Sequence, residues 1–491
     1  MKIRTTKTNS GSTAVQVVRS EYGKTIMLHH VGSGNTVEEI RALKQQAVLW
    51  LASYSRQQSL FSVSPLFEPL FSRYQYVGNR YTLLYTTLRK MLDHLGFSSL
   101  NNPILLDLVL MRVIEPTSKL QSVALLSQYF NIHYDISSVY KQLKHIALLQ
   151  DAVSSLLISF ARTHLHFDFS FVLYDVTTLY FESFTPDELR ACGFSKDNKA
   201  NQPQVVVGLL VNSEGFPLSY NVFPGNTFEG HTMIPIITKF VKKYAIKSLT
   251  VIADSAMLSD ANIESLEKES IHYIVGARLG YLSLSRVQDI VKHIKNTDHA
   301  SVRIPHKNSS LICDFSSKRY AKDKYETEKY VQKAHDIIEK KMAVKRHKFL
   351  SGKQGEFVIN QPLIDRTTLL WGIKGYATDL PIPNDDIITK YHSLWNVERS
   401  FRMTKSDLLA RPIYHFKTTS ITAHLLICIM ALAVGKYLEL TSKQTLRTIL
   451  KKLKQVSDAH IVDKKTGEEA EWRAEIPGDT KELLEILQAT Y

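Results

Sequence analysis

The pattern of apolar and polar positions divides the chain into blocks of different character. Near the N-terminus, the apolar runs TAVQVV and TIMLHHV flank a short turn at residues 21–24, which predicts a β-hairpin. A helix is expected from Thr36 to Leu51, with Thr36 as its N-cap. From residue 81 to 166, apolar residues recur at spacings of three and four, as they do along one face of a helix. The pattern therefore predicts a β-hairpin and helix region over residues 1–80 and a helical region over residues 81–166.

The next block, residues 167–278, alternates strand and helix patterns. Its expected order is a long strand, two hairpin strands, a helix, a strand, a helix and a final strand. This is the order of a ribonuclease H-like α/β core. Asp175 ends the apolar run FVLYD within the first strand, and Asp254 ends LTVIAD, the fourth strand. We expect both aspartates to lie where such a core keeps its metal ligands.

Residues 279–365 interrupt this core. Within them, residues 318–353 carry 12 Lys or Arg against 5 Asp or Glu, mixed with three tyrosines. A single lysine there suits a solvated charged helix, whereas the concentrated charge of the whole cluster favours contact with phosphate. The core is expected to resume over residues 366–440, where TLLWGIKGY is predicted as a strand, and a polar tail follows over residues 441–491. The expected fold class is therefore mixed α/β, with an interrupted ribonuclease H-like core that follows two smaller regions.

One stretch of the resumed core, YHSLWNVERSFRMTK, has a strongly polar face. Drawn as one helix, five residues fall within an arc of about 80°: Tyr391, Leu394, Glu398, Arg402 and Lys405. Such a face is too polar for a core stripe, and by itself it suits a solvated face with charge pairs. The upstream Asp175 and Asp254 favour another interpretation, because two strand aspartates and Glu398 can form a site for a divalent metal ion.

The charge balance favours a nucleic-acid partner. The 491 residues carry a net charge of +14, with a pI near 9.3. The three cysteines, Cys192, Cys313 and Cys428, are far apart and predict neither a disulfide nor a structural zinc site. The N-terminus lacks a signal-peptide pattern, and the longest apolar run, residues 425–434, is half the length of a membrane span. We therefore expect a soluble cytoplasmic protein without membrane association.

Two helices of the helical region have the spacing of a helix-turn-helix unit. SKLQSVALLSQYF is followed by the short turn NIHYD and then by ISSVYKQLKHIALL. The second helix offers Ser138, Lys141 and Lys144 for contacts with DNA phosphates or bases. Helical hairpins are common in proteins, so the alternative is a packing unit without DNA contact.

The polar face resembles a family signature. One branch of the bacterial insertion-sequence transposases of the DDE superfamily carries Tyr-x2-Arg-x3-Glu-x6-Lys, and this chain has Tyr391, Leu394, Glu398 and Lys405 at the matching positions. Leu394 stands where the family has arginine, so one phosphate contact of the family is missing. The resemblance covers residues 82–436, and its other stretches are YDVTTLYFES, GFSKDNKANQPQVVVGLLVNSEGFPLSYNVFPGN, ADSAMLSDANI (with Ala256 for the usual glycine) and RPIYHFKTTSITAHLLICIMALA.

The resemblance implies a chemistry for the three carboxylates. Asp175, Asp254 and Glu398 would be the catalytic residues and would hold two Mg²⁺ ions, for which Mn²⁺ substitutes. Asp175 would bridge the two ions, Asp254 would hold one and Glu398 the other. An activated water would cut one phosphodiester, and the freed 3′-OH would attack a second, which joins the element to new DNA. The block between Asp254 and Glu398 would be a β-rich insertion domain.

The resemblance also implies partners. These are double-stranded DNA, both terminal inverted repeats and target DNA, and a second copy of the chain in a homodimer on nucleoid DNA. Tyr391 and Lys405 would contact this DNA, and we hypothesise that Arg402 replaces the missing arginine; the alternative is a surface pair between Arg402 and Glu398. Two other functions stay open: a nuclease of the same fold that cuts without joining, and a transposase-derived DNA-binding protein that has lost catalysis.

Overall fold

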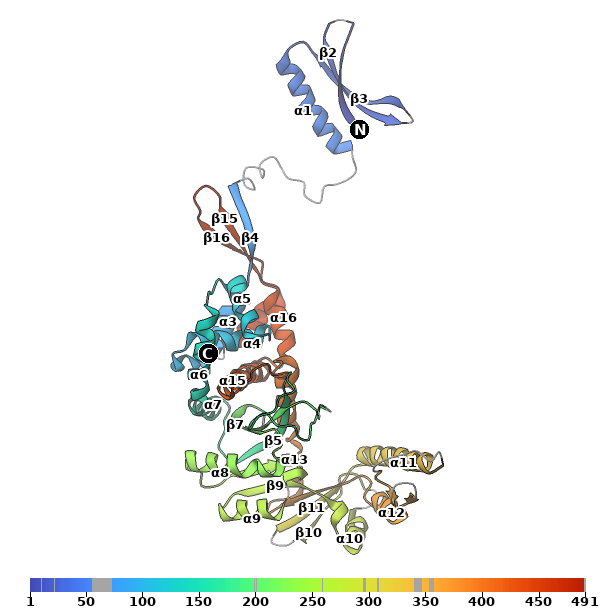
Figure 1. The fold of residues 1–491 in the computed structure, drawn as a ribbon. Helices are drawn as coiled ribbons and strands as arrows, with labels where there is room; N and C mark the ends of the chain where they lie inside the picture. Colours follow the sequence, from blue (N-terminus) through green and yellow to red (C-terminus); the bar gives the residue numbers. More distant parts are fainter. Residues whose placement is uncertain are drawn as a thin grey trace. The chain divides into compact units, whose positions relative to one another are not determined.

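The chain forms two compact units. One comprises Met1–Val77 with Ile461–Ala470, and the other comprises Gly78–His460 with Glu471–Tyr491. The division runs through three short strands, β4 (Tyr74–Arg80), β15 (Asp458–Asp463) and β16 (Glu469–Arg473). The computed structural model, drawn in Figure 1, describes residues 1–9, 11–21, 23–54, 73–197, 199, 201–257, 259–294, 297–306, 309–339, 347–352 and 357–489.

The first unit confirms the predicted β-hairpin and helix. Its elements are β1 (Lys2–Lys7), β2 (Thr13–Glu21), β3 (Lys24–Gly34) and α1 (Val37–Tyr54). The three strands form an antiparallel sheet in chain order, and β1 is a strand that the sequence pattern did not predict. The Glu39 N–H donates to Thr36 Oγ1 at 3.2 Å, and the Glu39 carboxylate accepts from the Thr36 N–H at 3.2 Å. This reciprocal capping box explains why the helix begins after Thr36.

The helical region is confirmed in the second unit. Its helices are α3 (Thr82–His94), α4 (Pro103–Ile114), α5 (Lys119–Phe130), α6 (Ile136–Ile146) and α7 (Gln150–His164). The helix α4 is apolar nearly all round because it packs against α15 (Thr418–Ser442), a helix from the far end of the chain. The helices of residues 81–166 are therefore part of one core with the C-terminal part of the unit.

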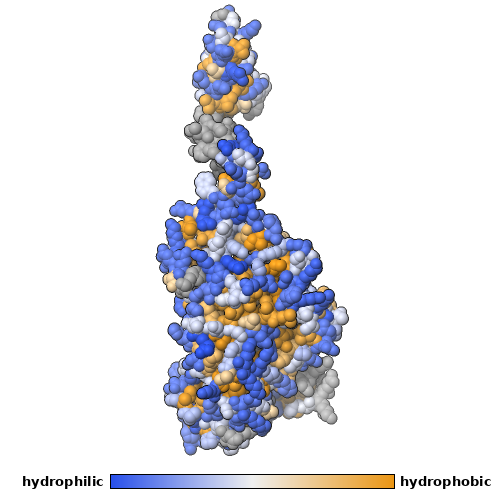
Figure 2. Space-filling model, turned by 90° about the vertical axis from the view of Figure 1, so that its left-hand side faces the viewer, coloured by the Kyte–Doolittle hydropathy of each residue, from blue (hydrophilic) through white to orange (hydrophobic). Residues whose placement is uncertain are grey.

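The apolar run at residues 425–434 lies within α15, where its side chains are buried. By length and composition two stretches could cross a membrane, Thr418–Ser442 and Ile136–His164. The first is 94% buried against the rest of the protein, as expected for a core helix. Hydrophilic and apolar side chains are interspersed on the face of the protein that Figure 2 shows.

An eight-stranded sheet forms the centre of the second unit. Its strand order is β10-β11-β14-β9-β8-β5-β6-β7, in which β5, β8 and β9 are parallel and β6 and β7 are antiparallel to their neighbours. The five strands that follow the predicted order are β5 (Phe171–Tyr180), β6 (Gln204–Val211), β7 (Pro217–Pro224), β8 (Thr250–Ala253) and β9 (His272–Ala277). The crossover helices are α8 (Met233–Tyr244) and α9 (Asp260–Lys268). A mixed α/β fold with a ribonuclease H-like core is confirmed.

The expectation of a β-rich insertion is wrong for the described residues. Helices predominate between β9 and β14: α10 (Leu284–Ile294), α11 (Ser317–Glu339) and α12 (Gln361–Leu369), beside the two-residue strands β12 (Leu350–Ser351) and β13 (Val358–Ile359). The longer strands β10 (Ser301–His306), β11 (Ser309–Phe315) and β14 (Ile373–Thr378) extend the core sheet instead. They do so because β14 pairs with the free edge of β9, and β11 then pairs with β14.

Of two sequence predictions in this part of the chain, one is corrected and one is confirmed. Only the end of TLLWGIKGY is a strand, because α12 continues to Leu369 and Gly372 turns the chain with a φ of +79°. The basic helix is confirmed as α11, although residues 340–346 and 353 of the basic cluster lie outside the described residues.

Residues 391–405 do not form one continuous helix. The structure has α13 (Asn384–His392), α14 (Trp395–Arg402) and a π-helical turn at Met403–Asp407. The regular α-helical hydrogen bonding is interrupted at Ser393 and Leu394, where the Leu394 N–H donates to the Tyr391 carbonyl at 3.0 Å and the Ser393 hydroxyl donates to the Lys390 carbonyl. Both residues keep helical dihedral angles, so a tighter turn separates the two helices, and Leu394 is buried there.

Residues 441–491, expected as a polar tail, contain regular secondary structure. They include α16 (Leu446–Lys454) and α17 (Gly478–Gln488), which both pack against α15. Leu446 and Leu483 are buried in the same core as α15.

Candidate active site

Asp175 and Asp254 lie side by side on neighbouring parallel strands. Tyr174 of β5 is paired with Ala253 of β8, so the residues that follow them occupy the same level of the sheet. Each aspartate accepts a short hydrogen bond from the next backbone N–H, at 2.7 Å from Val176 and 2.6 Å from Ser255. These bonds orient the two carboxylates at the position where an α/β sheet commonly binds its ligands.

The surroundings of Asp175 concentrate negative charge. Burial raises the pKa of the Asp175 carboxyl to about 6; the charges of Asp254 and Glu229 act in the same direction and Lys196 opposes them. Lys196 donates to the Val176 carbonyl at 2.6 Å and pairs with Glu229 at 3.0 Å. Lys196 therefore offsets part of the negative charge around Asp175.

Tyr391 connects α13 to this pair. Its hydroxyl donates to Asp254 Oδ1 at 3.3 Å, and its ring is buried. The contact requires Gly276 on β9, because a Cβ there would lie 2.6 Å from the Tyr391 hydroxyl. Burial and the Asp254 charge raise the pKa of Tyr391, so the hydroxyl keeps its proton and remains a donor.

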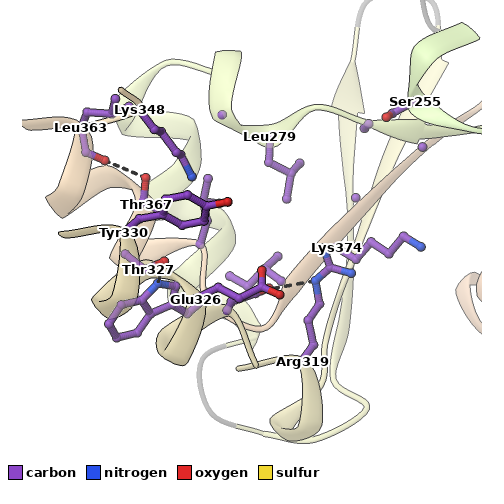
Figure 3. Close-up of a pocket in the computed structure, with 18 of the residues that line it drawn as sticks. Ser255, Leu279, Arg319, Glu326, Thr327, Tyr330, Lys348, Leu363, Thr367 and Lys374 are labelled. Carbon is purple, nitrogen blue, oxygen red and sulfur yellow. Dashed lines mark hydrogen bonds and ion pairs between the residues drawn. The ribbon is translucent and has the colours of Figure 1, made fainter. Parts of the chain in front are cut away.

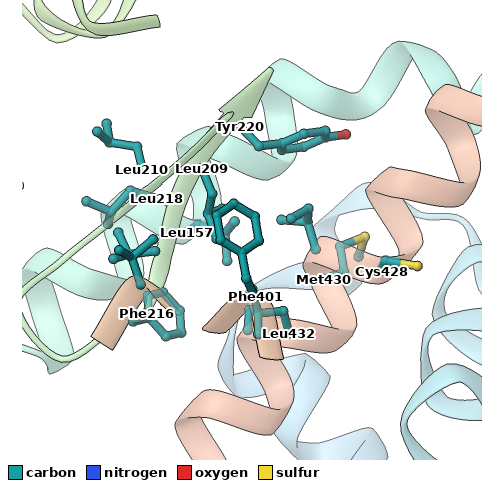
Figure 4. Packing of buried hydrophobic residues seen from close by; sticks show 14 of the residues in the cluster. Leu157, Leu209, Leu210, Phe216, Leu218, Tyr220, Phe401, Cys428, Met430 and Leu432 are labelled. Atoms are coloured by element: carbon teal, nitrogen blue, oxygen red, sulfur yellow. The ribbon is translucent and has the colours of Figure 1, made fainter. Parts of the chain in front are cut away.

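The buried face of α14 fixes the position of the helix that carries Glu398. Asn396 Nδ2 donates to the Ser213 carbonyl at 2.7 Å, and Ser400 Oγ donates to the Gly215 carbonyl at 2.6 Å, which ties the helix to the β6–β7 turn. Figure 4 shows Phe401 of the same helix between the side chains of β6 and β7 and those of α15. Glu398 itself is exposed, and its negative charge contributes to the raised pKa of Tyr391.

The carboxylates do not by themselves form a complete set of metal ligands. Among the residues that the structure describes, no three His, Cys, Asp or Glu side chains are arranged closely enough to hold a metal ion. The donor set itself fits Mg²⁺, which prefers carboxylate oxygens and binds through only one or two carboxylates together with phosphate and water. The pKa of Asp175, raised by burial and by its acidic neighbours, also fits a site that a cation completes.

Lys374 is a residue of the site that the sequence analysis missed. It lies on β14 with its ammonium 4.4 Å from the centre of the Tyr391 ring. Burial and Arg319 lower the pKa of Lys374, while Asp254 and Glu398 act in the opposite direction. Lys374 and Arg319 line a cavity of about 580 Å³ together with Asp254 and Tyr391 (Figure 3). A lone lysine in the apolar strand IKGYAT is the sequence signal that could have indicated it.

The other residues of the polar face have different surroundings. Leu394 is 7% exposed, so it contributes to the core and not to a phosphate site. Arg402 is exposed, and no ion pair joins it to Glu398, although both residues are described. The side chain of Lys405 is only 12% exposed and forms an ion pair with Asp197 at 3.4 Å. Asp197 also forms an ion pair with Arg411 at 2.9 Å.

The three candidate residues of the helix-turn-helix lie on an exposed face of α6. Ser138, Lys141 and Lys144 are exposed, whereas Val139 and Leu143 are buried. Asp135 caps the helix by accepting from the Ser138 N–H at 2.9 Å and its hydroxyl at 3.1 Å. The two lysines are therefore available to a partner, while the Ser138 hydroxyl is already engaged.

The fold and the paired aspartates define a protein of the ribonuclease H-like class with a carboxylate site. Residues 166–434, more than half of the chain, match the family model of the transposase DDE domain, and the chain belongs to this family. Among solved structures, the chain is similar to a cryo-EM structure of the piggyBac transposase synaptic complex with hairpin DNA, with a TM-score of 0.39 and 10% identity, covering 70% of this chain and 68% of that chain. No curated protein matches the sequence.

Proposed function

We propose that this protein is a bacterial insertion-sequence transposase of the branch with the Tyr-Arg-Glu-Lys signature. It binds the ends of its element, cleaves DNA strands there and joins them to target DNA. The observation that carries the proposal is the placement of Asp175 and Asp254 on adjacent strands, with Tyr391 hydrogen-bonded to Asp254. Membership of the transposase DDE domain family supports it.

The three carboxylates and their neighbours would have different roles in the reaction. Asp175, Asp254 and Glu398 would hold divalent cations, Mg²⁺ or Mn²⁺. Such ions, when bound, supply charge stabilisation for the attacking and leaving oxygens of a phosphodiester. Tyr391 would orient Asp254 through its hydrogen bond, and Lys374, whose ammonium lies 4.4 Å from the centre of the Tyr391 ring, would supply a positive charge for a DNA phosphate.

The partners in this proposal are double-stranded DNA, as terminal repeats and as target, and a second copy of the chain on nucleoid DNA in the cytoplasm. Two different surfaces would serve the DNA. The exposed lysines of α6 suit the recognition of the element's end, and the carboxylate site suits the scissile phosphate.

The test of the proposal is an assay of the purified full chain on duplexes that carry the ends of its element. Strand cleavage that requires Mg²⁺, followed by joining of the 3′ ends to a target duplex, is the expected result. Cleavage without joining would identify a nuclease of the same fold, and specific binding without cleavage would identify a DNA-binding derivative. The absence of both binding and cleavage would reject the proposal.

The exposed lysines of α6 are expected to contribute to DNA affinity. A plot of log affinity against log salt concentration has a negative slope. Each of Lys141→Ala and Lys144→Ala should make this slope less steep by about 1, as the loss of one phosphate contact does. The measurement is fluorescence anisotropy over a salt series with a duplex of the element's end.

This experiment needs the full chain, because the helices of residues 81–166 pack against α15 and are not an independent fragment. Lys292→Ala on α10 is the matched control, since Lys292 is exposed on another part of the unit. Unchanged salt slopes in both α6 variants would show that this helix faces away from DNA.

A further inference from the structure

A second cavity of the core is lined by basic side chains. It has a volume of about 530 Å³ and lies between the ends of α4 and α5, the segment 409–415 and α15. Five side chains that can carry positive charge line it: Arg112, Lys119, Arg411, His415 and His424. Thr117, Ser118 and Tyr140 line it as well. None of these residues belongs to the carboxylate site.

Two of these cations are buried and have only neutral partners. Arg112 is 6% exposed and donates to the carbonyls of Thr117 at 3.0 Å and Leu409 at 3.4 Å. Lys119 is 4% exposed, and its ammonium lies 2.8 Å from Nδ1 of His424. Nε2 of His424 lies 3.0 Å from the carbonyl of Ala410, so His424 is neutral, donates to that carbonyl and accepts from Lys119.

Acidic groups do not balance this charge. Over the described part of the chain, no Asp or Glu lines the cavity or pairs with Arg112 or Lys119; only Arg411 has a carboxylate partner, Asp197 at 2.9 Å. Burial, followed by the charge of Arg112, lowers the pKa of Lys119 to about 7. Burial and the same two cations lower the pKa of His415 to about 4. The positive charge without an acidic partner therefore lies on Arg112 and, below a pH of about 7, on Lys119.

Uncompensated buried cations are costly, because burial removes their water and nothing of opposite charge replaces it. An anion in the cavity would supply the missing charge. Arg112 and Arg411 offer planar guanidinium groups, and the Nε of Arg411 is buried without a hydrogen-bond partner. A phosphate has several acceptor oxygens and matches such donors better than a compact halide does.

We propose that this cavity is a phosphate-binding site, separate from the carboxylate site, and that its ligand is a phosphate group of the DNA backbone or of a free phosphate compound. Tyr140 connects the cavity to DNA recognition, because it lies on α6 next to the exposed Lys141. The proposal goes beyond the proposed function and does not depend on catalysis, since phosphate binding can be measured without cleavage.

The first test is thermal unfolding of the full chain with inorganic phosphate, at constant ionic strength against chloride. At a phosphate concentration about tenfold above its dissociation constant, the midpoint should rise by roughly 2 °C. Lys119→Met should unfold at a higher temperature than the wild type without phosphate, because it removes an unpaired buried charge, and it should lose the phosphate response. Lys292→Met, an exposed control, should keep the response.

A second variant tests the same proposal if Lys119→Met does not fold. His415→Glu places a carboxylate at the partly exposed side of the cavity, where it can pair with Lys119 or Arg112. It should raise the midpoint in chloride and abolish the phosphate response while the Lys119 contact to His424 stays intact.

Titrations with a duplex distinguish the two sources of phosphate. If the DNA backbone is the source, Lys119→Met and His415→Glu should weaken DNA binding roughly three- to tenfold, and inorganic phosphate should compete. If a free phosphate compound is the source, DNA affinity should stay unchanged while the phosphate response is lost. Variants that change neither the phosphate response nor the DNA affinity would overturn the proposal.

Discussion

The substitution Asp254→Asn is expected to reduce the rate of strand cleavage roughly a thousandfold or more, a loss of about 4 kcal/mol of transition-state stabilisation. Asp254→Asn keeps the size of the side chain but removes the negative charge that faces Asp175 from the neighbouring strand. Asp175→Asn and Glu398→Gln should have effects of the same order, because the three carboxylates would act on the same cations. The measurement is single-turnover cleavage of a labelled duplex at saturating Mg²⁺.

Cation binding provides an independent measurement for the same variants. Mg²⁺ should raise the unfolding midpoint of the wild type, because a ligand that binds only the folded state stabilises it, and Asp254→Asn should lose most of this shift. Glu264→Gln on the exposed side of α9 is the matched control and should behave like the wild type. DNA affinity should be retained in all variants. Cleavage by Asp254→Asn within about tenfold of the wild type would contradict the assignment.

Lys374→Met is expected to slow cleavage by roughly tenfold to a hundredfold, about 1.4 to 2.7 kcal/mol, with the fold retained. Lys374 lies over the Tyr391 ring and within the electrostatic influence of Asp254 and Glu398. Leu394 stands where the signature has arginine and is buried in the core, so this position supplies no cation, and we expect Lys374 to contact a DNA phosphate in its stead.

A comparison with Arg402→Ala decides between two sources of that cation. Arg402 is exposed and not paired with Glu398, so its contact with a DNA phosphate stays a prediction. If Arg402 makes this contact, Arg402→Ala should slow cleavage as much as we expect of Lys374→Met. Lys390→Met is the control for Lys374→Met, because the Lys390 ammonium packs 4.4 Å from the Phe171 ring instead. A large loss in Lys374→Met beside normal cleavage by Arg402→Ala assigns the role to Lys374. The reverse result would show that Arg402 replaces the missing arginine.

The sequence by itself determined the elements of the core and the positions of two aspartates. The alternation of strands and helices predicted β5 to β9 because most of these strands carry apolar runs and each crossover has an amphipathic helix between turn residues. Asp175 and Asp254 stand out since they interrupt or end such runs. Thr36 and Glu39 likewise predict where α1 begins, because a capping box is a local arrangement.

Only the tertiary structure decided which groups meet. Lys374 reaches Tyr391 because β14 pairs with β9, a contact between distant parts of the chain that no local pattern encodes. The same holds for Lys119 and His424, 305 positions apart, and for Lys405, which pairs with Asp197. The interruption at Ser393 and Leu394 is likewise not part of the helical periodicity, since it is a tighter turn in which the Leu394 N–H bonds to the Tyr391 carbonyl and Leu394 lies in the core. Local periodicity thus specifies the strands and helices, whereas the charges that surround the site depend on long-range pairing of the sheet.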